Sequence, residues 1–362
     1  MSLIALILRA YRRACRQLQR HLDRQPNLAS ALRELVLHQT LMGVVKDDHS
    51  SVECFLFHDR GCMLALRAEF NPRRKERFRG DGRTKLPDGV AFRSQGCFLD
   101  PYNIFLMQCG RQSPYALVLN GRKFNFWAQP FGFGRGHCTF TSALQEPQDW
   151  RKLGIPALER RMTDMYTLVE RLGDAYCVLL NGEDAGASIL DWYHQHVLLA
   201  DNLKIRQAAR NAAGGRAFPR VLRIDQPYWP LPVFRIAGSR RCVVAESVRL
   251  ASRWQTIAGD RATECISMAI EEGRVVCYYV PRDRRRTRAR GFAGVVGAYE
   301  CAAGVFIFSE EDEGRRLREA ERDEAEGGEA GKGFASLWQI LLEVRPEMAA
   351  DLLACEPASV EV

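Results

Sequence analysis

One segment of this 362-residue chain limits its possible folds more than any other: a turn of small residues between two β-prone runs. The segment 181–199 reads NGEDAGASILDWYHQHVLL, and β-prone residues also fill 176–180 before it. Gly186 and Ala187 leave room for an anion to approach the backbone N–H groups, and Ser188 adds a hydroxyl donor. The sequence therefore predicts a strand over 176–180, an anion-binding turn, and a second strand over 191–199.

Two histidines follow this turn at alternate positions. Alternate residues of a strand share a face, so Trp192, His194 and His196 are expected to project together, and Tyr193 and Gln195 to point away. A neutral imidazole can attack phosphorus without first losing a proton. Two interpretations stay open at this point: a pair of hydrogen-bonded core histidines, or a phosphoryl-transfer site with His194 as nucleophile. The adjoining turn favours the second.

The same segment resembles the active-site signature of one branch of the histidine-triad (HIT) superfamily. That branch contains galactose-1-phosphate uridylyltransferases, diadenosine tetraphosphate phosphorylases and GDP-sugar phosphorylases, and its signature is Asn-x-Gly…Gly-Ala-Ser…His-x-His-x-Gln. Aligned through 186–188, this chain has Trp192 at the first histidine, His194 at the nucleophile and His196 at the glutamine. Histidine at the third position occurs within the superfamily, whereas Trp192 departs from it.

Shorter matches extend the resemblance over most of residues 35–320. Runs at 70–73 (FNPR) and 97–100 (CFLD) resemble the F-N-P-x-R and C-F-L-C elements of an uncharacterised bacterial family close to these phosphorylases. Asp100 replaces the second cysteine, so a Cys-x-x-Cys zinc site cannot form there, and no metal site is expected. Further matches lie at 115–120, 129–131, 136–140, 280–282, 297–300 and 309–312.

The resemblance implies a set of site residues. His194 and His196 are the expected catalytic residues, and the expected substrate-binding residues are Asn181, Gly186, Ala187, Ser188, Asn120, His137 and Arg282. The spacer 121–128 looks like an insertion, which leaves open whether Asn120 or Asn125 is the asparagine of the family. His137 is expected either to bind nucleotide or to cap its strand. Arg282, in the basic run 281–290, is a candidate phosphate ligand.

The resemblance also implies an activity. A nucleotidyltransferase or phosphorylase would cleave a nucleoside diphosphate sugar or a dinucleoside polyphosphate through a nucleotidyl-histidine intermediate, with phosphate or a sugar phosphate as acceptor. No cofactor is required, and Mg²⁺ could arrive with the nucleotide. Because Trp192 replaces a histidine, the alternative is a catalytically impaired HIT-like protein that binds nucleotide as a sensor or scaffold. A homodimer is also an option.

The expected fold is α+β and HIT-like, an antiparallel sheet with flanking helices, in which two HIT-like halves form one unit. The expected parts are an N-terminal helical segment (1–40), a HIT-like half with the motif (41–215), a second α+β half (216–320), and an acidic linker with a C-terminal amphipathic helix (321–362). Apolar periodicity predicts helices over 4–24 and 155–172. Strands are expected over 103–108 and 241–246, and 262–269 is expected to be helical or mixed.

The overall composition limits the expected cellular location and the expected binding partners. The chain carries 52 Lys+Arg against 44 Asp+Glu and has twelve scattered cysteines, which suggests reduced thiols. Its first apolar run is too short to span a bilayer and is followed by Arg9, Arg12 and Arg13, the reverse of a secretory signal. A cytoplasmic location without membrane attachment is therefore expected. Nucleic acid is not an expected partner, because the basic segments 9–24 and 282–290 lack clustered aromatic residues.

Overall fold

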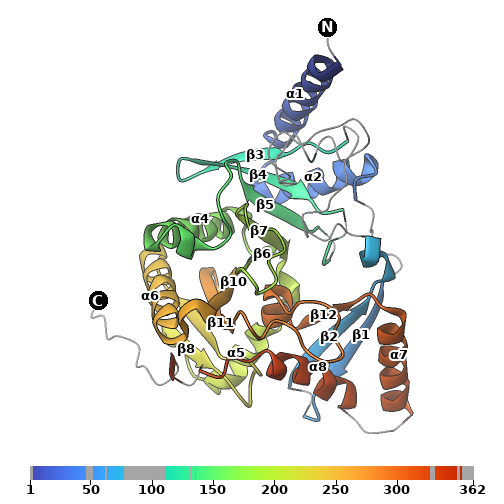
Figure 1. Cartoon of the computed structure of the whole chain (residues 1–362), viewed down its shortest axis with the longest axis vertical. Helices are drawn as coiled ribbons and strands as arrows, with labels where there is room; N and C mark the ends of the chain where they lie inside the picture. The colour runs from blue at the N-terminus through green and yellow to red at the C-terminus, as the bar shows by residue number, and fades with distance from the viewer. Residues whose placement is uncertain are drawn as a thin grey trace.

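A long antiparallel sheet forms the centre of the molecule (Figure 1). The computed structural model describes residues 3–45, 52–61, 63–76, 104, 111–130, 132–134, 136–326, 331–348 and 351–352. The nine strands lie in the order β3-β4-β5-β7-β6-β10-β11-β9-β8, and each neighbouring pair is antiparallel. Their bounds are β3 Tyr115–Leu119, β4 Arg122–Ala128, β5 Cys138–Ser142, β6 Tyr176–Asn181, β7 His194–Leu199, β8 Val221–Ile224, β9 Val233–Ala237, β10 Ala262–Glu271 and β11 Arg274–Asp283.

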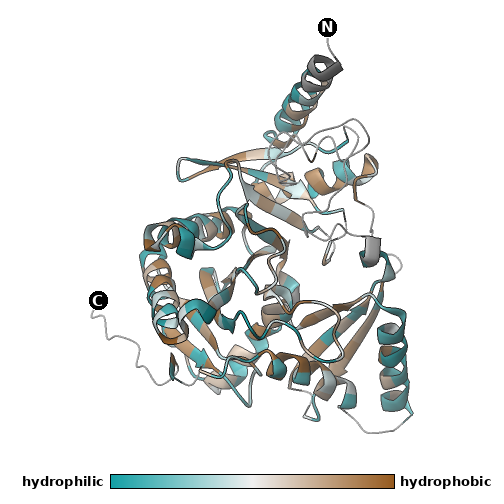
Figure 2. Cartoon of the chain, viewed as in Figure 1, coloured by the Kyte–Doolittle hydropathy of each residue, from teal (hydrophilic) through white to brown (hydrophobic). Residues whose placement is uncertain are grey.

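A second, three-stranded sheet has the order β1-β2-β12. It joins β1 (Glu53–His58) and β2 (Ala65–Phe70), which are antiparallel, to β12 (Val305–Phe308), which runs parallel to β2. Helices α7 (Glu311–Ala325) and α8 (Lys332–Glu343) pack on it. In Figure 2 the strands are largely brown, whereas much of α7 is teal, so α7 turns a hydrophilic side to solvent.

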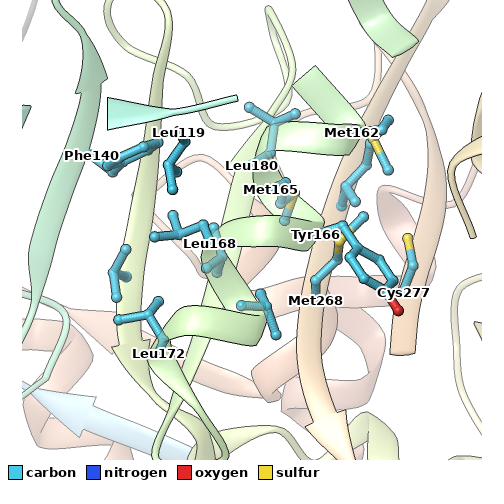
Figure 3. Close-up of a cluster of buried hydrophobic side chains, with 14 of the residues drawn as sticks. Leu119, Phe140, Met162, Met165, Tyr166, Leu168, Leu172, Leu180, Met268 and Cys277 are labelled. Atoms are coloured by element: carbon cyan, nitrogen blue, oxygen red, sulfur yellow. The ribbon is translucent and has the colours of Figure 1, made fainter. Parts of the chain in front are cut away.

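Helices cover one face of the large sheet. They are α1 (Leu3–Leu22), α2 (Leu28–Leu41), α4 (Ile155–Leu172) and α6 (Arg240–Ala258). The predicted helix over 155–172 is confirmed: Pro156 lies in its first turn and Gly173 follows its end. Figure 3 shows Met162, Met165, Leu168 and other side chains of this helix packed against the strands. Each large apolar side chain buried in this way contributes roughly 2 kcal/mol to folding.

The opposite face of the large sheet packs towards the small sheet, together with α5 (Ile205–Ala213) and a single π-helical turn, η5 (Tyr299–Ala303). Strand β6 shows the alternation. Val178 and Leu180 contact the helix-covered core, whereas Cys177 and Leu179 belong to the other core. The large sheet is therefore buried on both faces in its middle.

Several expected elements differ in the structure. Residues 241–246 belong to α6 rather than to a strand, because Ser239 caps that helix by accepting a hydrogen bond from the N–H of Cys242. Residues 262–269 form part of strand β10. Residues 121–128, for which no strand was predicted, contain β4, the second strand of a hairpin. The expected strand 103–108 lies outside the described residues except for Ile104, which is helical.

The sheet crosses the expected boundary between the two halves, since β6 pairs with β10 over Asn181↔Cys265 to Cys177↔Ala269. No helix in the described part of the chain is long and apolar enough to cross a bilayer.

Candidate functional site

A cavity of about 680 Å³ opens where β5, β6 and β7 meet the segments that follow β6 and β11. Both expected halves line it. Residues 181–196 provide Asn181, Gly186, Ala187, Ser188, Ile189, His194 and His196, and the later part of the chain provides Thr287, Arg288, Gly297, Tyr299 and Glu300, among others.

His194 begins strand β7, and a buried glutamine fixes its backbone. The His194 N–H donates to Gln148 Oε1 at 2.9 Å, and Gln148 Nε2 donates to the carbonyls of His194 (3.1 Å) and Asn181 (2.7 Å). Gln148 therefore ties the start of β7 to the end of β6, the two backbone segments that carry the predicted motif. Gln148 lies outside the motif and is not among the predicted site residues.

The His194 ring is held by the main chain. Its Nδ1 lies 2.9 Å from the carbonyl oxygen of Trp192, and because a carbonyl only accepts, Nδ1 carries the proton. Burial lowers the pKa of His194 below its usual range, an effect that the Trp192 carbonyl and Asp191 partly offset, so the ring is neutral near pH 7. Its Nε2 then has a lone pair, and no described residue bonds to that atom. Such a nitrogen can act as a nucleophile.

His196 lies on the same face, with its ring 5.6 Å from that of His194 and perpendicular to it. Its Nδ1 is 3.0 Å from Nε2 of His137, which directly precedes β5, the neighbouring strand. Burial, His194 and Arg74 lower the pKa of His196 to about 3. The structure thus brings three imidazoles together: His137 lines the cavity and is hydrogen-bonded to His196.

Trp192 is placed differently from the expectation. Strand β7 begins at His194, so Trp192 precedes the strand and does not share the cavity face with the histidines. Its indole N–H donates to the Ser142 carbonyl at 2.9 Å, and its ring packs with Ile104, Trp127 and Ile189. Tyr193 and Gln195 lie on the other face of the strand, where they bond to each other.

The turn before β7 is packed against the later part of the chain. A Cβ on Gly186 would lie 2.7 Å from Gly297 Cα and 3.0 Å from Asn181 Oδ1, an atom that accepts a hydrogen bond from the Ala298 N–H at 2.6 Å. The N–H of Ala187 donates to the Gly182 carbonyl at 3.4 Å. This N–H is therefore not free for an anion, contrary to the expectation. Ser188 is exposed and lines the cavity.

Arg74 supplies a buried cation at the cavity. Its Nη1 donates to the Gly132 carbonyl at 3.1 Å, and its guanidinium lies 4.6 Å from the centre of the Phe133 ring. Arg74 occupies the last position of an F-N-P-x-R pattern that begins at Phe70, one residue beyond the run 70–73. The signal was therefore present in the sequence, and reading the pattern to its end would have found this residue.

Two predicted substrate-binding residues lie away from the cavity. Asn120, in the β3–β4 turn, donates to Asp164 at 2.9 Å, and the alternative, Asn125, is buried in β4. Arg282 is fully buried in β11, where its Nη1 lies 2.8 Å from the Val296 carbonyl oxygen and 2.8 Å from Cys301 Sγ. Arg282 was expected in a loop, but β11 extends to Asp283. From the basic run, the exposed Arg288 lines the cavity instead.

Metal ligands do not gather in the described ranges: within them, no three His, Cys, Asp or Glu side chains are arranged to hold an ion. Residues 97–100, the cysteine run of the sequence analysis, lie outside those ranges.

No family model matches this chain, and no curated protein sequence matches it. It is similar to crystal structures of yeast Ap4A phosphorylase Apa2. For the complex with AMP, the TM-score is 0.56 at 12% identity, covering 87% of this chain and 96% of that chain. For the complex with Ap4A, the TM-score is 0.54 at 12% identity, covering 85% and 95%. The expected α+β, HIT-like fold is confirmed by this likeness.

Proposed function

We propose that this chain is a nucleotidyltransferase of the phosphorylase type, which moves a nucleotidyl group to phosphate through His194. The substrate would be a nucleoside diphosphate sugar or a dinucleoside polyphosphate. One observation carries the proposal: the Trp192 carbonyl holds the His194 Nδ1 proton, so Nε2 keeps a lone pair at a cavity large enough for a nucleotide. The folds of the AMP and Ap4A complexes of Apa2 give it further support.

In the first half of the reaction, His194 Nε2 attacks the α-phosphorus, which lies beside Ser188. The P–N bond forms as the bond to the leaving phosphate breaks, and the electron pair goes to the leaving oxygen. The ring becomes positive, and the Nδ1–H bond to the Trp192 carbonyl stabilises that charge. In the second half, a phosphate oxygen attacks the same phosphorus and returns the electron pair to Nε2.

The cavity wall provides partners for the rest of the substrate. Arg74 and Arg288 would offset the charge on the phosphoryl oxygens. Ile104, Trp127 and Ile189 form an apolar wall suited to a base. Mg²⁺ would arrive with the diphosphate.

Turnover tests the proposal. The chain is incubated with labelled GDP-sugars and dinucleoside polyphosphates in the presence of phosphate, and products are separated. His194→Ala should lower the rate on the order of a thousandfold or more, since each factor of ten is about 1.4 kcal/mol of barrier. His58→Ala, at the exposed end of β1, is the matched control and should leave the rate unchanged. Equal turnover by His194→Ala and wild type would defeat the proposal.

The covalent intermediate gives an independent test. Without phosphate, the labelled nucleotidyl group should stay on the protein in an acid-labile bond and be released when phosphate is added. His194→Ala should acquire no such label.

A second candidate function is nucleotide binding without turnover, and Trp192 in place of the first histidine of the signature is the observation that favours it. Such a sensor or scaffold would be stabilised by nucleotide but form no product. A ligand present at a hundred times its dissociation constant stabilises the fold by about 2.7 kcal/mol, which a thermal-shift screen detects.

A further inference from the structure

We infer that His137 is a positioning residue that fixes the proton of His196 on Nε2, so that His196 presents a hydrogen-bond donor to the substrate phosphate. The inference rests on the proposed function. It gives the two histidines of β7 opposite tautomers: His194 keeps a lone pair on Nε2, and His196 keeps a proton there.

The proton position is set by a relay of two hydrogen bonds, from Phe133 to His137 and from His137 to His196, and this relay starts at the main chain. The N–H of Phe133 lies 2.9 Å from His137 Nδ1, and an amide N–H can only donate, so His137 Nδ1 accepts. A neutral His137 then carries its proton on Nε2. Its ring is held in this position by stacking on Phe133 at 4.8 Å, and Gly132 packs against it so closely that a Cβ there would lie 3.0 Å from His137 Cβ.

The second step passes to His196. His137 Nε2 lies 3.0 Å from His196 Nδ1, so the His137 N–H donates and His196 Nδ1 accepts. A neutral His196 therefore carries its proton on Nε2. The neutral state persists at physiological pH, because burial and the neighbouring His194 and Arg74 lower the pKa of His196 to about 3. No described residue bonds to His196 Nε2, and its ring lines the cavity.

It matters which ring nitrogen of His196 carries the proton, because phosphate oxygens are hydrogen-bond acceptors. An imidazole nitrogen with a lone pair would repel them, whereas an N–H would bond to the charge that builds up during transfer. A glutamine, the residue that the resembled signature has at this position, always offers an amide donor. His196 does the same in only one tautomer, so it needs a partner that a glutamine would not need.

A double-mutant cycle tests this dependence. His137→Phe keeps an aromatic ring that can stack on Phe133 but cannot donate a hydrogen bond. In the wild-type background it should lower kcat by roughly ten- to a hundredfold and change KM less. In a His196→Gln background the same change should alter kcat less than about threefold. His137→Gln, which keeps an N–H donor, should restore part of the loss. Equal losses from His137→Phe in both backgrounds would show a merely structural role and overturn the inference.

A measurement without substrate separates this inference from the proposed function. Long-range ¹H–¹⁵N spectra of histidine-labelled protein report which ring nitrogen carries the proton. We expect His194 protonated on Nδ1 and His196 on Nε2, and we expect His137→Phe to shift His196 towards the other tautomer. A wild-type His196 protonated on Nδ1 would refute the relay even in an active enzyme. The expected tautomers in a protein without turnover would refute only the proposed function.

Discussion

Trp192 serves His194 through its backbone, not through its side chain. The bond to His194 Nδ1 comes from the Trp192 carbonyl, which any residue at this position would provide. The indole itself packs with Ile104 and Trp127, which line the cavity, but it does not line the cavity itself. The departure from the signature at this position therefore leaves the orientation of the His194 ring intact.

Replacing this residue separates the two candidate functions. Trp192→His should change kcat/KM less than about threefold, because the carbonyl remains. It should lower the free energy of unfolding by roughly 3 kcal/mol, because a large buried ring is lost from an apolar cluster. Steady-state kinetics and urea denaturation measure the two effects. Trp192→Phe serves as control and keeps most of the apolar volume. A sharp gain of turnover in Trp192→His would instead mark the natural protein as impaired.

Two buried arginines should respond differently to the same substitution. Arg74→Met should raise the KM for nucleotide about tenfold or more, because Arg74 lines the cavity. Arg282→Met should leave KM unchanged, since Arg282 lies outside the cavity. It should lower the free energy of unfolding by about 3 kcal/mol, because Cys301 and the Val296 carbonyl lose their buried partner. A KM effect of Arg282→Met equal to that of Arg74→Met would contradict this assignment.

Most of the cavity-lining residues that could be predicted from the sequence lie within one continuous motif. His194, His196 and Ser188 follow one another along the chain, and all three line the cavity. Gln148 could not be found in this way, because it reaches His194 only through the pairing of distant strands. Arg282 was misplaced because a run of arginines predicts a solvated loop, and only the structure shows that β11 carries the chain into the core.

At the scale of elements, α4 could be predicted from the sequence, whereas β10 could not. Helix α4 is apolar on one side only, so its period is visible in the sequence, and it ends at Gly173. Strand β10 is buried throughout residues 262–269 and has no alternation between polar and apolar positions. A strand covered on both faces cannot be distinguished from a buried helix by its period.

Gly186, in the turn before β7, packs closely against Gly297, so substituting Gly186 should have a strong effect on activity and stability. This residue has φ +103°, and an added Cβ would lie 2.7 Å from Gly297 Cα. Gly186→Ala should therefore separate the two cavity-lining segments and lower both kcat/KM and stability. Gly215→Ala is the matched control, since Gly215 has φ +76° but nothing within 4 Å of the added Cβ. The control should lose only about 1–2 kcal/mol of stability, the cost of placing a residue with a Cβ in the left-handed conformation, and should keep its activity. Equal stability losses and full activity in both variants would contradict the role of this contact.

At the scale of the whole molecule, the two expected halves share one sheet and one cavity. Strand β6 pairs with β10, and β7 lies between β5 and β6, so the strand order does not follow the chain. Such long-range pairing leaves no local signal in the sequence, although the fold class could be predicted from the motif. The cavity-lining residues of one half therefore depend on the other half for their position.

The neutral histidines of the cavity also make the stability of the whole molecule depend on pH. Their pKa values in the fold lie below the 6.5 expected after unfolding, so the unfolded chain binds protons first as the pH falls. The stabilisation is therefore complete above pH 6.5 and decreases below it, down to about pH 3 for His196. Each such histidine contributes a slope of about 1.4 kcal/mol per pH unit within its window. Urea denaturation between pH 4.5 and 7.5 should show this loss for the wild type and a slope smaller by that amount for His196→Gln, because glutamine has no proton to gain. Parallel curves for the two proteins would mean that His196 gains its proton in the fold over the same pH range as in the unfolded chain, and once protonated its Nδ1 could not accept from His137.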